Sequence, residues 1–208
     1  NHTGYLEIST LIEAYSNYLK SLNSFSNEGF NYTEIEFLDN GIQYKNIQAK
    51  HIIFAEGFGL HANPYFNDLP LDGTKGELFI IKAPNLDLDV VIKSSVFILP
   101  IGTDLYKVGA TYDWKDKTNT PTEEGKQELV DKLKEIISCD FEIVKHFGGV
   151  RPTVKDRRPL VGTHPEFKQL HVLNGLGTRG VMLGPYLANQ LFQHIENDIP
   201  LEKEIDII

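Results

Sequence analysis

The stretch that decides the fold is LHVLNGLGTRGVMLGPYLANQLFQHI, residues 170–195. It begins with a short apolar run, continues through a turn that contains Gly175, Gly177 and Gly180, and ends in a long amphipathic segment. This order predicts a β-strand, a glycine-rich turn and an α-helix. The glycines have the G-x-G-x-x-G spacing, which lets the main chain turn sharply and brings the N–H groups of a helix N-terminus close to an electron-rich ligand.

The same spacing is typical of sites for a dinucleotide pyrophosphate, but the context differs. In such sites a second strand follows the helix, and an acidic residue about 20 positions further on holds the ribose. Here only ENDIPLEKEIDII follows the helix. The sequence therefore leaves three roles open for the turn: a pyrophosphate site, a site for another ligand, or turn geometry alone.

Composition limits the function classes. A chain of 208 residues with 41% hydrophobic residues can bury one good core or two small ones. The net charge is −9, with 20 basic and 29 acidic residues, which argues against nucleic acid or an anionic membrane as a partner. No run approaches the 18 apolar residues of a membrane span.

Cysteine and histidine usage indicates the compartment and the metal content. The single cysteine, Cys139, excludes an internal disulfide and a cysteine-based metal site. The N-terminus lacks the pattern of a signal peptide, so we expect a cytoplasmic protein. The seven histidines show no metal-ligand spacing, and we expect no metal.

The first third of the chain predicts helix, hairpin and strand. Apolar residues at helical spacing in Ile8–Leu22 predict a helix with one buried face, and Asp39-Asn40-Gly41 predicts a hairpin turn. The apolar run in Ala49–Gly57 predicts a strand of a parallel sheet, buried on both faces. The fingerprint-like segment Gly57–Ala62 follows, but Asn63-Pro64 argues against a helix there.

The middle of the chain predicts antiparallel β-structure, with short β-rich runs at Gly76–Lys82, Val90–Lys93, Val96–Pro100 and Leu105–Thr111. A helix is expected to begin after Thr122, its N-cap, and Phe141–Phe147 is expected to be a strand. Residues 148–167, GGVRPTVKDRRPLVGTHPEF, are rich in glycine, proline and basic residues. They predict an ordered loop without regular structure.

Three stretches together resemble the FAD-dependent amino-acid oxidase superfamily, which includes glycine oxidase and sarcosine oxidase. They are HIIFAEG (51–57), GGVRPTVKDRRPLVGTHP (148–165) and LNGLGTRGVMLGPYLANQL (173–191), and FILPIGTDLYKVGATYDW (97–114) is also similar to glycine oxidase. The resemblance covers nearly the whole chain. Three motifs in the right order are far more specific than any one of them.

One feature of that superfamily is missing. Its members begin with a strand and a G-x-G-x-x-G that holds the FAD pyrophosphate, and neither lies upstream of Tyr5. The resemblance therefore implies the C-terminal part of a longer protein, with the missing N-terminal segment as its partner. The implied α/β (α+β) fold is the remainder of a Rossmann-like FAD-binding domain, residues 1–70 and 148–208, plus an antiparallel substrate domain, residues 71–147.

The resemblance also implies FAD as the cofactor and assigns site residues. Arg151 stands at the G-x-R-P position of the arginine that binds the substrate carboxylate, and Tyr112 and Trp114 are expected to line a pocket over the flavin. The expected cofactor-binding residues are Gly57, Gly149, Gly177, Arg179, Gly180, Val181, Met182 and Leu183. The structural alternatives are an Arg151–Asp156 ion pair, an ordinary glycine-capped helix, and core or rim positions for the two aromatic residues.

The implied function is oxidation of the C–N bond of a small amino acid or secondary amine by hydride transfer to flavin, although the isolated piece is expected to be inactive. The alternative class is a catalytically silent module that binds a carboxylate ligand or a protein partner. An oxidase that acts on tRNA is a further possibility within the enzyme class. The net charge of −9 argues against it unless another domain supplies a basic surface.

Overall fold

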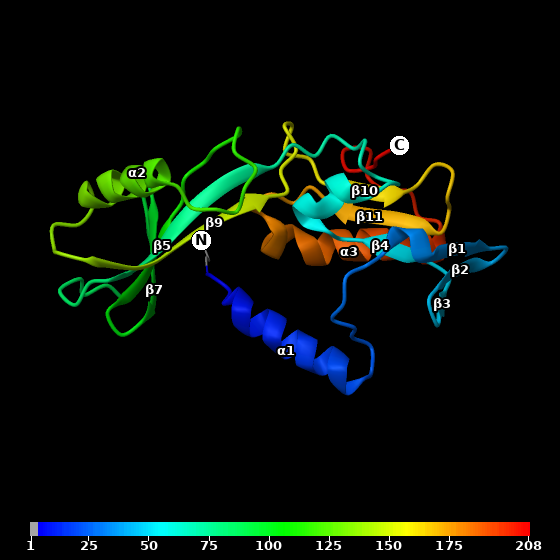
Figure 1. Cartoon of the computed structure of the whole chain (residues 1–208), viewed down its shortest axis with the longest axis horizontal. Coiled ribbons are helices and arrows are strands. Elements are labelled where there is room, and N and C mark those ends of the chain that lie inside the picture. Colours follow the sequence, from blue (N-terminus) through cyan, green and yellow to red (C-terminus); the bar gives the residue numbers. More distant parts are fainter. Residues whose placement is uncertain (1–3) are drawn as a thin grey trace.

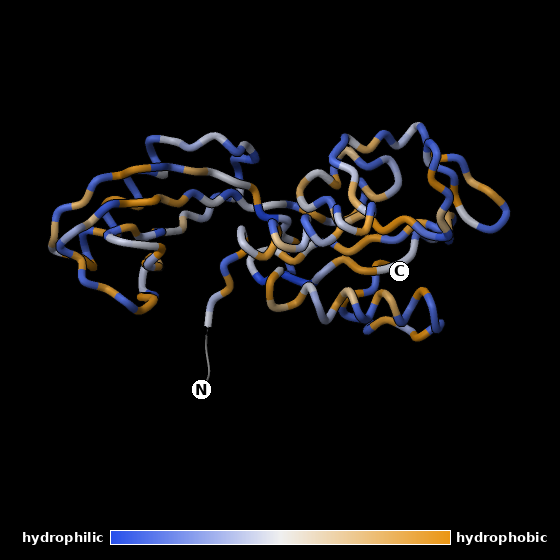
Figure 2. The backbone as a smooth tube through the Cα atoms, turned by 90° about the horizontal axis from the view of Figure 1, so that it is seen from below, coloured by the Kyte–Doolittle hydropathy of each residue, from blue (hydrophilic) through white to orange (hydrophobic). Residues whose placement is uncertain are grey.

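The computed structural model describes residues 4–208 as an elongated α/β molecule (Figure 1). A five-stranded sheet lies at one end, and two three-stranded sheets with the C-terminal helix lie at the other. Hydrophobic and hydrophilic residues alternate along the chain at both ends (Figure 2). The helices of the described residues are α1 (Ile8–Ser21), α2 (Glu123–Lys134) and α3 (Gly180–Asn197), with short 3-10 helices at Tyr32–Glu34 and Gly57–Ala62.

The five-stranded sheet is antiparallel throughout and has the order β6-β7-β8-β5-β9. Its strands are β5 (Thr74–Lys82), β6 (Ile92–Lys93), β7 (Phe97–Gly102), β8 (Leu105–Gly109) and β9 (Glu142–Arg151). Leu129 and Leu133 of α2 are fully buried against Phe79 and Ile81 of β5. Thr122 caps α2, because its hydroxyl accepts the Gly125 N–H at 3.0 Å. The predicted antiparallel sheet and helix are thus confirmed.

The second sheet has the order β10-β11-β4, and its strands are β4 (Ile52–Phe54), β10 (Leu160–Thr163) and β11 (Leu170–Asn174). Strands β4 and β11 are parallel, as the apolar run in 52–54 predicted. Neighbouring residues of β10 point to opposite faces. Leu160 packs against Phe54 and Val172, whereas Val161 packs against Leu187 of α3, so this short sheet is covered on both sides.

The third sheet is a small meander of β1 (Ile35–Leu38), β2 (Gly41–Tyr44) and β3 (Ile47–Ala49). Leu38 pairs with Gly41, so Asp39 and Asn40 form the two-residue turn that the sequence predicted. Phe37 stacks on Phe167 with 4.6 Å between ring centroids, which ties the meander to the second sheet. In residues 4–208 no helix is both long and apolar enough to cross a membrane.

Three local expectations are wrong. Helix α1 forms where predicted but buries none of its residues, since it lies apart from the rest of the molecule (Figure 1). Strand β4 is an edge strand, and Ile53 is 52% exposed, so the strand is not buried on both faces. Gly57–Ala62 forms a 3-10 helix of six residues, which ends at its C-cap, Asn63, directly before Pro64.

The prediction of a loop over residues 148–167 is also wrong in two places. Strand β9 continues to Arg151, and β10 occupies Leu160–Thr163. Glycine normally weakens a strand interior, but here another backbone approaches closely. A Cβ on Gly148 would lie 2.9 Å from the Asn119 carbonyl oxygen. Arg151 is therefore held at the end of a paired strand, a more rigid position than a loop offers.

A chain of hydrogen bonds through three histidines joins the second sheet to α3. Its links are His51 Nδ1 to His171 Nε2 at 3.0 Å, His171 Nδ1 to Thr163 Oγ1 at 2.9 Å, Thr163 Oγ1 to His194 Nε2 at 3.1 Å, and His194 Nδ1 to the Ile199 carbonyl at 3.1 Å. The carbonyl can only accept, so His194 donates from Nδ1. With neutral histidines every following link then has one donor and one acceptor.

We expect the stability of the protein to fall in mild acid because of this chain. Burial, followed by the charges of His51 and His194, lowers the pKa of His171 from 6.5 to about 4. The unfolded state therefore takes up the proton first, and stability present above pH 6.5 is lost as the pH falls toward 4, by up to about 3 kcal/mol. Urea unfolding across this pH range measures the loss.

The His171→Asn variant should show a shallower decline of unfolding free energy between pH 6.5 and 4. His61→Asn, at an exposed position, is the matched control and should keep the wild-type slope. Equal slopes for His171→Asn and wild type would contradict the role of the histidine chain.

Candidate active site

Strand β5 separates two polar regions because its side chains alternate between faces. Lys75 and Glu77 point to one face, and Gly76 lies between them on the other. Arg151 pairs with Thr74 across β5 and β9, so it shares the face of Gly76. A Cβ at position 76 would overlap the Arg151 guanidinium. Glycine at this position thus lets the guanidinium lie across β5.

The Arg151 guanidinium is half-buried and has no carboxylate partner within 4 Å in the described chain. Its Cζ lies 5.0 Å from the centroid of the Tyr112 ring, and both Nη atoms lie 3.5 Å from the Thr111 carbonyl oxygen. Asp156, the alternative partner, instead accepts the Arg158 N–H at 2.9 Å. Burial lowers the pKa of Arg151, while Tyr112 opposes this shift. Arginine nevertheless stays protonated in proteins.

Tyr112 stands between Arg151 and the glycine-rich turn. Its ring meets that of Trp114 edge-on at 6.0 Å, and both side chains are partly exposed, at 47% and 39%. Tyr112 also lines a cavity of about 390 Å³ with Thr153 and residues 175–179. The structure thus brings the predicted residues Tyr112, Gly177 and Arg179 together around one cavity, with Arg151 and Trp114 in contact with Tyr112.

The glycine-rich turn is fixed at the carboxyl end of the parallel strands. Gly175 and Gly177 have φ values of +71° and +55°, which favour glycine, and the Gly177 N–H donates to the Pro152 carbonyl at 2.9 Å. Buried Asn174 donates to the Gly57 carbonyl at 2.9 Å and accepts the Gly175 N–H at 2.8 Å. Ligands of open α/β sheets bind at this edge, and Gly57 and Gly177 both lie beside Pro152 there.

The N-terminus of α3 is open. Arg179 is the N-cap but makes no side-chain cap bond, and the N–H groups of Gly180 and Val181 have no acceptor within residues 4–208. The Val181 and Met182 side chains are 50% and 69% exposed, whereas Leu183 packs against the core beside α3. Free N–H groups with apolar side chains beside them suit the electron-rich edge of a flat ring.

Gly149 is the predicted cofactor residue that lies elsewhere. It pairs with Gly76 in the five-stranded sheet, and a Cβ there would meet no atom within 4 Å. Together with Arg151 it lines a separate hollow of about 310 Å³. The structure therefore places Gly149 with the arginine and away from the glycine-rich turn.

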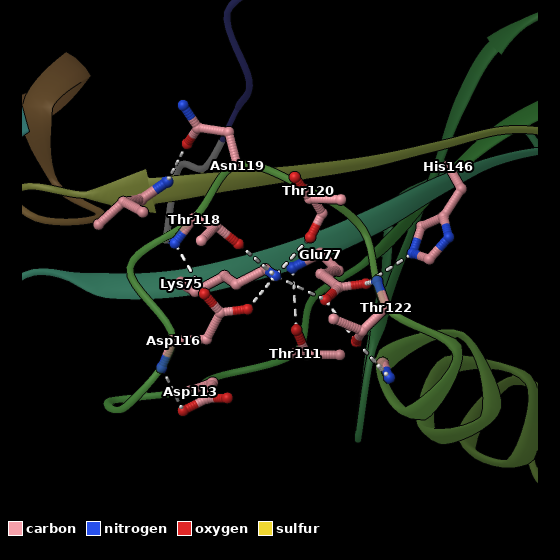
Figure 3. Close-up of polar contacts among 12 residues, drawn as sticks. Lys75, Glu77, Thr111, Asp113, Asp116, Thr118, Asn119, Thr120, Thr122 and His146 are labelled. Atoms are coloured by element: carbon pink, nitrogen blue, oxygen red, sulfur yellow. Dashed lines mark hydrogen bonds and ion pairs between the residues drawn. The ribbon is translucent and has the colours of Figure 1, made fainter.

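A buried ion-pair cluster that was not predicted from the sequence lies behind the Arg151 face (Figure 3). Lys75 and Glu77 are 1% and 3% exposed, with 3.4 Å between Nζ and Oε1. The Lys75 ammonium also donates to Asp116 and to the Thr120 carbonyl. Glu77 accepts the Thr122 N–H at 3.0 Å and its hydroxyl at 2.8 Å. The cluster thus ties β5 to the loop before α2.

The charges of this cluster are sustained by its contacts. Burial by itself would lower the pKa of Lys75, but the hydrogen bond with Asp116 and the charge of Glu77 raise it. Burial would likewise raise the pKa of Glu77, but the bonds from Thr122 and the charge of Lys75 lower it. His146 Nε2 lies 2.8 Å from Glu77 Oε2 without hydrogen-bond alignment. Lys75 and Glu77 therefore form an ion pair.

The same two residues hold the segment that carries Tyr112. The main chains of Lys75 and Asp113 exchange two hydrogen bonds, of 2.8 and 2.9 Å. The Glu77 N–H donates to the Thr111 hydroxyl at 2.8 Å, and the Thr111 N–H donates to the Glu77 carbonyl at 3.2 Å. The bonds to Thr111 and Asp113 flank Tyr112. The available sequence signal was two opposite charges at i and i+2 of a strand, flanking a glycine.

We expect Lys75→Met to destabilise the fold by about 3 to 5 kcal/mol, because it leaves Glu77 buried without its cation. Urea or guanidinium unfolding measures this loss. Lys82→Met, at the exposed end of the same strand, is the matched control and should change stability by less than about 0.5 kcal/mol. Equal losses of unfolding free energy in the two variants would show that the buried pair contributes no more to stability than an exposed lysine does.

Comparisons with known proteins identify the family of this chain. The family model described as "FAD dependent oxidoreductase" (DAO) matches residues 28–193. The glycine oxidase of Bacillus subtilis is 24% identical over 168 residues, which cover 77% of this chain and 44% of that protein. The tRNA 5-methylaminomethyl-2-thiouridine biosynthesis bifunctional protein of Marinobacter nauticus is 28% identical over 188 residues, which cover 80% and 30%.

Solved structures show the same fold. The iminodiacetate oxidase of Chelativorans sp. superimposes with a TM-score of 0.67 at 22% identity, over 83% of this chain and 51% of that one. The glycine oxidase of Geobacillus kaustophilus gives a TM-score of 0.64 at 22% identity, over 84% and 49%. The chain thus spans about half or less of the length of these relatives. With its matched span, fold and glycine-rich turn, the chain belongs to the DAO family of FAD-dependent oxidoreductases.

Proposed function

We propose that the protein oxidises the C–N bond of an amino acid or secondary amine, with Arg151 holding the substrate carboxylate. The observation that carries this proposal is a half-buried guanidinium that has no carboxylate partner within residues 4–208 and lies across Gly76 beside a hollow and the Tyr112 ring. A desolvated cation without a partner is costly in a fold. An anionic ligand group supplies the compensation.

The fork of the guanidinium matches a carboxylate with two parallel hydrogen bonds. The Arg151 main chain is fixed in β9, and the Tyr112 ring covers one side of the guanidinium. These contacts fix the direction of the fork before substrate arrives. The substrate is therefore held by its carboxylate in one orientation, and its amine and α-carbon are positioned by that single anchor.

The N-terminus of α3 would hold the flavin. The N–H groups of Gly180 and Val181, together with the positive end of the helix dipole, would stabilise negative charge on the reduced ring. Bound FAD supplies the acceptor for a hydride from the substrate carbon. The substrate amine must be neutral, because its lone pair forms the C=N bond as the hydride leaves. This step requires no dedicated protein base.

A small substrate is favoured over an RNA. The chain carries a net charge of −9, which repels a phosphate backbone. The hollow beside Arg151 has a volume of about 310 Å³, which suits an amino acid. The name of the Marinobacter relative refers to tRNA, so RNA oligonucleotides belong in the substrate panel as the competing class.

We expect Arg151→Lys in the full-length protein to raise KM for a carboxylate-bearing amine by about 30-fold or more. The reason is that the ammonium replaces the two-point bond with one, and losing a buried charge contact costs about 2 to 5 kcal/mol. Steady-state oxidation kinetics measure this change. Arg158→Lys, at an exposed site, should keep the wild-type KM. An unchanged KM in Arg151→Lys would remove the carboxylate role.

The purified full-length protein should show the visible absorbance of a bound flavin, because the turn and the start of α3 form its site. The spectrum is recorded before and after added FAD and passage through a desalting column. A preparation that stays colourless would favour the silent carboxylate-binding module.

A further inference from the structure

We propose that the substrate carries an apolar substituent larger than a methyl group, and that this substituent lies over β5 and β9 next to Arg151. The inference rests on the proposed function and names the substrate class. It comes from the hollow of about 310 Å³, which is lined by Gly76, Leu78, Phe147, Arg151 and residues 148–150.

The register of the two strands creates this hollow. Gly76 pairs directly with Gly149, and Leu78 pairs with Phe147. Because side chains alternate along a strand, these four residues share the face of Arg151. Two facing glycines leave a depression in that face, and a Cβ on Gly149 would meet no atom within 4 Å. Gly148 also lines the hollow, but a Cβ there would point to the opposite face, 2.9 Å from the Asn119 carbonyl oxygen.

The hollow is chemically divided along the strands. Its near end is the guanidinium, which lies across Gly76. Its far end is the pair Leu78 and Phe147. This pair is the next one on the same face after Gly76 and Gly149, so it lies about 7 Å further along the strands at their normal rise. Glycine bound at Arg151 would leave Leu78 partly exposed, together with the part of the Phe147 ring that Lys145 Nζ, 4.7 Å from the ring centroid, does not cover. A substituent of about four to five carbon atoms reaches them and buries their apolar surface, for about a fourfold gain in affinity per methylene.

Two matched pairs of probes test this in the full-length holoenzyme: glycine against leucine, and sarcosine against N-benzylglycine. The expected result is a kcat/KM at least tenfold higher for the larger member of one pair. A preference for leucine over glycine would place the substituent on the α-carbon, and a preference for N-benzylglycine over sarcosine would place it on nitrogen. Equal values, or a preference for the smaller member in both pairs, would overturn the inference.

The Gly149→Ala variant tests the location of the substituent. The new methyl group projects into the hollow, so the kcat/KM ratio of the larger to the smaller substrate should fall at least tenfold. Gly29→Ala is the matched control, since a Cβ there also meets no atom within 4 Å and the residue lies far from the sheet in sequence. It should keep the wild-type ratio. A wild-type ratio in Gly149→Ala would overturn the assignment of the hollow.

The flavin absorbance of each variant is recorded alongside the kinetics, because Gly149 was also predicted to bind the cofactor. A holoenzyme that oxidises none of the four probes overturns the proposed function, and the inference with it. An active enzyme that prefers the smaller probes overturns the inference alone. The comparison of the four probes in the wild-type enzyme tests the inference without any variant. It therefore remains a valid test even if the Gly149→Ala protein does not fold.

Discussion

The buried ion pair between Lys75 and Glu77 is the constraint on which the site depends. Both charges are almost fully removed from water, so each requires the other and the surrounding hydrogen bonds. Those bonds reach the loop before α2 and the segment that carries Tyr112. A cluster on one face of β5 therefore fixes an aromatic ring that covers Arg151 on the other. The geometry of the Arg151 face is thus set by buried atoms on the opposite side of β5.

A second constraint acts at the other end of the molecule. The parallel pair of β4 and β11 ends in two glycine turns, and Asn174 connects them through its amide group. The Gly177 N–H then binds the Pro152 carbonyl, directly after Arg151. The turn at the start of α3 and Arg151 are thus joined through two short steps of main chain. A flavin held at α3 and a carboxylate held at Arg151 would keep a fixed separation.

Much of this arrangement was predictable from sequence, because it depends on local patterns. Periodicity and turn residues predicted the antiparallel sheet, α2, the Asp39-Asn40 hairpin and the final strand, turn and helix. What the sequence did not predict depends on contacts between distant residues. Gly148 and Gly149 look like loop residues until β5 is placed beside them, and Lys75 looks like a surface residue until the loop before α2 covers it. The exposure of α1 is likewise invisible in its periodicity.

The contact between Gly76 and Arg151 also limits how this sequence can change. Any side chain at position 76 would occupy the space of the guanidinium, so the guanidinium keeps its place across the strand only while position 76 is glycine. A lineage that replaced the arginine would be released from that restriction, and position 76 could then acquire a side chain. Paired substitution at these two positions would therefore record a change of ligand chemistry, even where the remaining sequence still specifies the same fold.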